Sequence, residues 1–75
     1  MAETKRKYAH DGVYEYNGRK SYVRAWKEGR GRQQEIMVQV WINGNPDGEP
    51  QGDWAMPGII GLEGAIEQSI LQTKR

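Results

Sequence analysis

The 75-residue sequence contains no cysteine, and this absence removes two common ways of stabilising a small domain. Neither a disulfide nor a thiolate metal site can hold the fold together. A chain of this length buries only about 60% of the surface that its unfolded form exposes, so any core must be small. Apolar residues are also few, since leucine, isoleucine, valine and phenylalanine together account for 12 of the 75 residues.

Groups that commonly carry catalysis are scarce. The one histidine, His10, has only Asp11 beside it, and sequence adjacency does not make a catalytic dyad. Neither a nucleophile–histidine arrangement nor a His/Cys zinc site can be placed in this sequence. No phosphate-binding Gly-x-x-x-x-Gly-Lys-Ser/Thr motif is present. We therefore predict a non-enzymatic protein with no cofactor and no metal site.

Long apolar runs are absent as well. No run of about 18 apolar residues occurs, which argues against a transmembrane helix. The first seven residues are polar and have no apolar segment behind them, so they do not resemble a secretory signal. These features predict a soluble, cytoplasmic protein with no membrane partner.

Neither sign of charge dominates the whole chain, which has a net charge of +1. The basic and acidic residues are, however, unevenly distributed along it. Residues 1–32 hold nine basic and four acidic side chains, whereas residues 33–75 hold two basic and six acidic ones. Such asymmetry is typical of a protein whose basic part contacts a polyanion. The alternative is that the two halves attract each other within the fold.

The first ten residues differ in pattern from the rest. They show no apolar periodicity and contain the basic cluster Lys5, Arg6 and Lys7. We predict a flexible basic arm over residues 1–10, followed by a single small domain over residues 11–75.

The pair Asn17-Gly18 is the strongest local signal, because both residues tolerate the positive φ that a two-residue hairpin turn needs. It joins two β-prone runs, residues 13–16 and 19–27. A two-residue turn places Tyr14 opposite Ser21 and alternates the side chains between two faces. One face of the hairpin then carries Tyr14, Tyr16, Ser21, Val23 and Ala25, and the other carries Val13, Glu15, Lys20, Tyr22, Arg24 and Trp26.

A further strand is predicted over residues 35–42. β-Branched residues occupy every even position there, namely Ile36, Val38, Val40 and Ile42. Because side chains alternate along a strand, all four lie on one face, which we expect to face the core. Residues 43–58 hold seven glycines or prolines, and a short fourth strand over residues 52–56 is compatible with an edge position.

Residues 59–73 predict a C-terminal helix, because Ile59, Leu62, Ile66 and Ile70 recur at helical spacing. A helix that begins near Gly61 fits the sequence equally well. The predicted fold class is α+β, with strand order β-β-β followed by α. It has a three-stranded antiparallel sheet, or a four-stranded one if residues 52–56 add the edge strand, and one helix packed on one face.

One helix cannot cover both faces of such a sheet, so one face is expected to be open. The side chains predicted there combine rings with cations and an amide, and they are Lys20, Tyr22, Arg24, Trp26, Met37, Gln39 and Trp41. Large exposed apolar patches mark interaction sites on small proteins. The alternative is that the loop 43–58 folds back, so that Trp54 and Met56 cover Trp26 and Trp41.

Our first functional hypothesis is nucleic-acid binding, because aromatic rings stack on bases and neighbouring cations contact phosphates. The stacking residues would be Tyr22, Trp26 and Trp41. Phosphate or base contacts would come from Lys20, Arg24, Arg30, Arg32 and Gln39, and from the arm residues Lys5, Arg6 and Lys7. In element order alone, residues 12–73 are similar to the N-terminal DNA-binding modules of some phage and transposon integrases.

The second hypothesis is a protein-binding module of the kind that phages and mobile elements encode, which inhibits or adapts a host protein. Trp, Tyr and Arg dominate the energetics of protein interfaces, so the same surface would serve this function. The net charge of +1 favours this second hypothesis, because nucleic-acid domains are usually more basic. Either hypothesis is compatible with a monomer or a homodimer.

Overall fold

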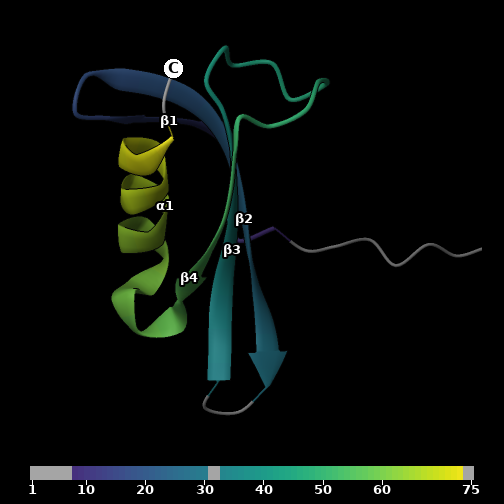
Figure 1. Ribbon diagram of the computed structural model, residues 1–75, viewed down its shortest axis with the longest axis vertical. Coiled ribbons are helices and arrows are strands. Elements are labelled where there is room, and N and C mark those ends of the chain that lie inside the picture. Colours follow the sequence, from purple (N-terminus) through teal and green to yellow (C-terminus); the bar gives the residue numbers. More distant parts are fainter. Residues whose placement is uncertain (1–7, 31–32, 74–75) are drawn as a thin grey trace, which may run out of the picture.

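The computed structural model describes residues 8–30 and 33–73, which form one antiparallel sheet with a helix against one face (Figure 1). The strands are β1 (His10–Tyr16), β2 (Arg19–Arg30), β3 (Gln33–Trp41) and β4 (Gly52–Pro57). A short 3-10 turn, η1 (Gly58–Ile60), leads into the helix α1 (Gly61–Gln72). The order in the sheet is β1-β2-β3-β4. The predicted α+β class is confirmed, and the fourth strand forms at the edge.

The hairpin of β1 and β2 has the register that its turn dictates. Asn17 and Gly18 have φ values of 57° and 77°, as a two-residue turn requires. Tyr14 pairs with Ser21, as predicted. Because turn length fixes the pairing, this register could be derived from the sequence alone.

The core lies between the sheet and α1. Ile36, Val38 and Val40 of β3 are buried there, as the alternation of β3 predicted. Val23 and Ala25 of β2 stand directly opposite Val40 and Val38. The helix contributes Ala65, Ile66 and Ile70 to the same cluster. The predicted fourth aliphatic residue, Ile42, follows the end of β3 and is half-buried.

The helix begins at Gly61, the later of the two starts considered. Ile59 therefore does not belong to the apolar stripe of the helix, and 92% of it is exposed. Gly61 has a φ of 84°, a conformation that favours glycine and that turns the chain between η1 and α1. The prediction that Ile59 continues the stripe was wrong, because the periodic spacing extends across this turn by coincidence.

The strand β4 places Trp54 and Met56 on the helix side of the sheet. Trp54 pairs with Val38, which faces the core, and Trp54 Nε1 donates a hydrogen bond to Thr73 Oγ1 at 2.8 Å. Met56 belongs to the core cluster. The interpretation that these two side chains cover Trp26 and Trp41 is therefore wrong, because the alternation of β4 carries them to the opposite face.

The sheet begins before residue 11. The Ala9 N–H donates a hydrogen bond to the Ala25 carbonyl oxygen at 2.8 Å, and His10 is the first residue of β1. Residues 8–10, expected in the arm, are thus attached to the sheet. The rest of the predicted arm, with Lys5, Arg6 and Lys7, lies outside the described residues, as does Arg32.

Replacement of Val38 by alanine tests the assignment of the faces. Val38→Ala should lower the free energy of unfolding by about 1–3 kcal/mol, because two buried methyl groups are lost. Gln39→Ala, one residue along on the other face, should change it by no more than about 0.5 kcal/mol. Urea melts measure both values. Equal losses at the two positions would contradict the assignment.

Candidate functional site

The face of the sheet opposite α1, called the open face below, carries side chains in rows that the strand register fixes. One row crosses all four strands as Asp11, Arg24, Gln39 and Asp53. The next row is Trp26, Met37 and Ala55, and the row after it is Glu28, Glu35 and Pro57. The register therefore brings together most of the side chains that the sequence analysis selected.

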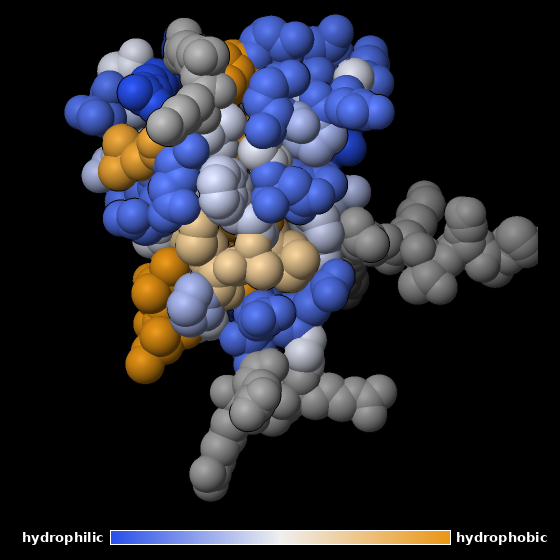
Figure 2. All heavy atoms as spheres, viewed as in Figure 1, coloured by the Kyte–Doolittle hydropathy of each residue, from blue (hydrophilic) through white to orange (hydrophobic). Residues whose placement is uncertain are grey.

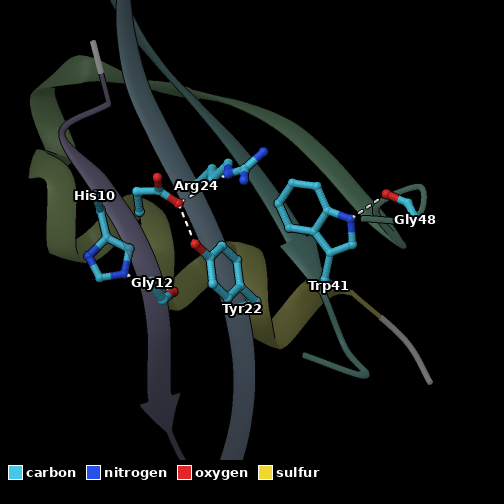
Figure 3. Close-up of polar contacts among 7 residues, drawn as sticks. His10, Gly12, Tyr22, Arg24, Trp41 and Gly48 are labelled. Atoms are coloured by element: carbon cyan, nitrogen blue, oxygen red, sulfur yellow. Dashed lines mark hydrogen bonds and ion pairs between the residues drawn. The ribbon is translucent and has the colours of Figure 1, made fainter. Parts of the chain in front are cut away.

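Arg24 lies at the centre of an aromatic cluster on the open face, and Figure 3 shows it beside Tyr22 and Trp41. Its guanidinium carbon is 5.4 Å from the ring centre of Tyr8, 5.7 Å from that of Tyr22 and 5.4 Å from that of Trp41. The rings of Tyr22 and Trp41 also meet edge to face, with their centroids 6.0 Å apart. Because a guanidinium is attracted to the face of an aromatic ring, Arg24 links the three rings into one unit.

Asp11 holds Arg24 in this position. Arg24 Nε donates a hydrogen bond to Asp11 Oδ1 at 3.1 Å, and the Tyr22 hydroxyl donates one to the same oxygen at 2.6 Å (Figure 3). The hydrogen bond from Tyr22, followed by that from Arg24, lowers the pKa of Asp11 because both stabilise the carboxylate. The same hydrogen bond with Asp11 raises the pKa of Tyr22.

Trp26 and Trp41 are buried although they lie on the open face, with exposed fractions of 6% and 3%. Tyr8 packs edge-on against Trp26, with the ring centroids 5.8 Å apart. Trp41 is covered by Arg24, and its Nε1 donates a hydrogen bond to the Gly48 carbonyl oxygen at 2.8 Å. The expectation that both rings are exposed is wrong, because Tyr8 packs on Trp26, and Arg24 and the loop residue Gly48 contact Trp41.

Sequence reasoning missed two members of this cluster, Tyr8 and Asp11. Asp11 had a readable signal, since extension of the hairpin register beyond Val13 places Asp11 directly opposite Arg24. Opposite charges at such a position stabilise an antiparallel pair. Tyr8 had no signal of this kind, because it precedes β1 and packs on Trp26 through a tertiary contact.

The charges on the open face are mainly negative. Its carboxylates come from Asp11, Glu15, Glu28, Glu35 and Asp53, and its cations from Lys20 and Arg24, while alternation along β2 assigns Arg30 to the same face. Arg24 is already paired with Asp11. Of the other predicted basic residues, Arg30 ends β2 and Arg32 lies outside the described residues. The described part of the sheet therefore does not form the basic surface that the sequence suggested.

An apolar strip lies between these carboxylates. It consists of Met37, which is half-buried, and of Ala55 and Pro57, which are exposed. Met37 pairs with Ala55 across β3 and β4, and it stands opposite the buried Trp26 on β2. Within the described residues no element packs over this strip, so its apolar surface faces water.

No protein-family model, no curated protein and no solved structure matches this chain. In residues 8–30 and 33–73, no group of three or more His, Asp or Glu side chains could hold a metal ion. The helix in the same part of the chain is too short to cross a membrane. The site must therefore be interpreted from its own geometry.

The lowered pKa of Asp11 predicts how stability depends on pH. A carboxylate whose pKa is depressed in the folded state stabilises the fold above its unfolded pKa, near 3.9, and this stabilisation is lost as the pH falls. Thermal melts should thus show a steeper fall in Tm from about pH 4 to pH 2 for the natural chain than for Asp11→Asn.

Asp53→Asn is the matched control, because the Asp53 carboxylate makes no hydrogen bond or ion pair with the described residues. Asp53→Asn should show the same fall in Tm between about pH 4 and pH 2 as the natural chain. If Tm fell as steeply for Asp11→Asn as for the natural chain over this pH range, the result would contradict the assigned role of Asp11.

Proposed function

We propose that this protein is a non-enzymatic protein-binding module whose open face receives a basic and partly apolar segment of another protein. The observation that carries the proposal is the uncovered apolar strip of Met37, Ala55 and Pro57, which is bordered by carboxylates. The bordering side chains are Glu28, Glu35 and Asp53.

The strip supplies the apolar area that a partner would bury. Burial of apolar surface contributes about 25 cal/mol per Å², and this gain offsets part of the entropy that association costs. Met37 suits such a surface, because the flexible and polarisable thioether chain adapts its shape to a partner. Ala55 and Pro57 are compact, so they allow an approaching backbone to come close to β4.

The carboxylates select the charge of the partner. Glu28 and Glu35 stand directly opposite each other on β2 and β3, a position in which like charges destabilise the pair. Glu28 Oε2 also accepts a hydrogen bond from Trp26 Nε1 at 2.6 Å, which holds this carboxylate on the open face. A lysine or arginine placed between the two carboxylates relieves the repulsion and forms charge-assisted hydrogen bonds.

The Arg24 cluster prepares this surface for binding. Trp26 lies in the same row as Met37 and is held by Tyr8 on one side and Glu28 on the other. Side chains that are already ordered lose little conformational entropy on binding. The strip is therefore supported by a fixed neighbour and does not need to form when the partner arrives.

Nucleic-acid binding, the first hypothesis from the sequence, has less support from the described surface. A phosphate backbone would be repelled by the carboxylates around the strip. The rings of Trp26 and Trp41 are covered, whereas a base stacks only on an accessible ring. Most of the basic residues that favour this hypothesis lie outside the described residues. These are Lys5, Arg6, Lys7 and Arg32.

A Met37→Lys variant tests the proposal. The probe is a fluorescein-labelled peptide of alternating lysine and leucine, titrated by anisotropy. Met37→Lys should weaken its binding at least about tenfold, because the variant removes apolar contact and adds a like charge to the strip. Leu71→Lys, at an exposed position of α1, adds the same charge away from the open face and should leave the affinity nearly unchanged.

Labelled single-stranded and duplex oligonucleotides serve as the counter-probe, at about 50 mM salt, where phosphate contacts are strong. We expect no binding to either. Binding of an oligonucleotide that Met37→Lys strengthens, together with no binding of the peptide, would overturn the proposal in favour of nucleic-acid recognition.

A further inference from the structure

The two most exposed of the large apolar side chains in the described residues lie at opposite ends of the sheet. Ile59, 92% exposed, belongs to η1, which follows the end of β4. Val13, 57% exposed, lies in β1 toward the Asn17-Gly18 turn. Figure 2 shows apolar residues gathered at the lower left, where η1 and the start of α1 lie in Figure 1. An apolar side chain that projects this far into water gains free energy when a partner buries it.

Two glycines fix Ile59 as a projecting knob. A Cβ atom on Gly58 would lie 2.7 Å from the Gln34 carbonyl oxygen, so glycine allows η1 to approach β3 closely. Gly61, with its φ of 84°, then redirects the chain into α1. None of the η1 residues is buried, and Ile60 beside the knob is 41% exposed. Ile59 therefore stands on a short turn that holds it away from the core.

A surface pocket of about 160 Å³ lies at the other end of the sheet, and it is lined by Val13, Lys20, Ser21, Ile42, Asn43 and Gly44. A cavity of about 150 Å³ is large enough for benzene, so a pocket of this volume admits the four-carbon side chain of isoleucine. Val13 and Ile42 provide apolar walls for it. The pocket is too far from η1 along the strands for the molecule to fill it with its own Ile59.

The charged residue that follows the knob in the sequence and the charged residue that lines the pocket have opposite signs. Lys20 lines the pocket, and its ammonium group makes no ion pair within 4 Å with the described residues, including its cross-strand neighbour Glu15. Glu63, which is exposed, follows Ile59 by four residues and lies in the first turn of α1. The insertion of the knob would therefore bring a carboxylate toward an unpaired ammonium group.

We propose that Ile59 of one molecule inserts into the Val13–Ile42 pocket of a second molecule, with Glu63 of the first beside Lys20 of the second. The knob and the pocket are different surfaces, so the contact is heterologous and produces head-to-tail oligomers. A contact this small is weak and depends on concentration. It does not use the apolar strip of the open face and stands or falls separately from the proposed function.

Sedimentation velocity over about 5 µM to 1 mM protein tests the association. The mean sedimentation coefficient of the natural chain should rise with concentration. Ile59→Ser should shift this rise to concentrations at least about tenfold higher, because the knob is lost. Leu71→Ser, which alters an exposed side chain at the far end of α1, should sediment as the natural chain does.

Complementation makes the test specific. Val13→Asp retains the knob and loses the pocket, whereas Ile59→Ser retains the pocket and loses the knob. Both positions are exposed, so both variants should fold. At a concentration where the natural chain begins to associate, neither variant should associate alone, and an equimolar mixture should form a 1:1 dimer and nothing larger.

An exchange of the two charges tests whether Glu63 of one molecule lies beside Lys20 of the other. Lys20→Glu and Glu63→Lys should each weaken association, and the double variant should recover it. A natural chain that stays monomeric at the highest concentration would overturn the proposal. So would oligomers of Ile59→Ser that form at the same concentrations as those of the natural chain, or a mixture of Val13→Asp and Ile59→Ser that does not dimerise.

Discussion

The open face depends on one interaction, the guanidinium of Arg24 paired with Asp11 and surrounded by three aromatic rings. A sheet backed by one helix leaves its second face to water, and this chain has few aliphatic side chains with which to cover it. Arg24 meets this constraint because its planar cation stacks on rings while its Nε–H binds a carboxylate. The result is a second packed layer, built from aromatic rings and one ion pair.

This second layer determines which part of the face remains for binding. Trp26 and Trp41, two of the side chains predicted to stack on bases, are buried in this layer, whereas Met37, Ala55 and Pro57 lie outside it. The charged residues are also divided between two parts of the chain. The described residues hold five basic and nine acidic side chains, whereas residues 1–7, 31–32 and 74–75 hold six basic side chains and one acidic. The uneven charge along the sequence thus separates an acidic sheet-and-helix unit from basic segments outside the described residues.

Much of the fold could be predicted, because short-range rules fix it. The turn Asn17-Gly18 determines the register of β1 and β2, and the alternation of β3 determines which side chains reach the core. Prediction failed where a strand pairs across a long loop, because the loop does not fix the register. The strand over residues 52–56 was predicted, but the long loop before it does not specify which residue of β3 lies opposite Trp54, and the observed pairing with Val38 places Trp54 on the helix side.

The candidate site was harder to predict than the fold. The register placed Tyr22, Arg24 and Gln39 on one face correctly, since they follow from the hairpin and from alternation. Whether a ring on that face is exposed depends instead on distant residues. Tyr8 comes from the N-terminal segment, and Gly48 comes from the loop between β3 and β4. Neither contact leaves a periodic pattern in the sequence.

The central claim is that the open face buries Trp26 and Trp41 and exposes the apolar strip to solvent. NMR with a neutral, soluble gadolinium chelate tests it most directly. The account predicts strong relaxation enhancement for the methyl protons of Met37 and Ala55, and weak enhancement for the ring protons of Trp26 and Trp41. Ring protons of the two tryptophans that relax as strongly as the Ala55 methyl group would contradict it.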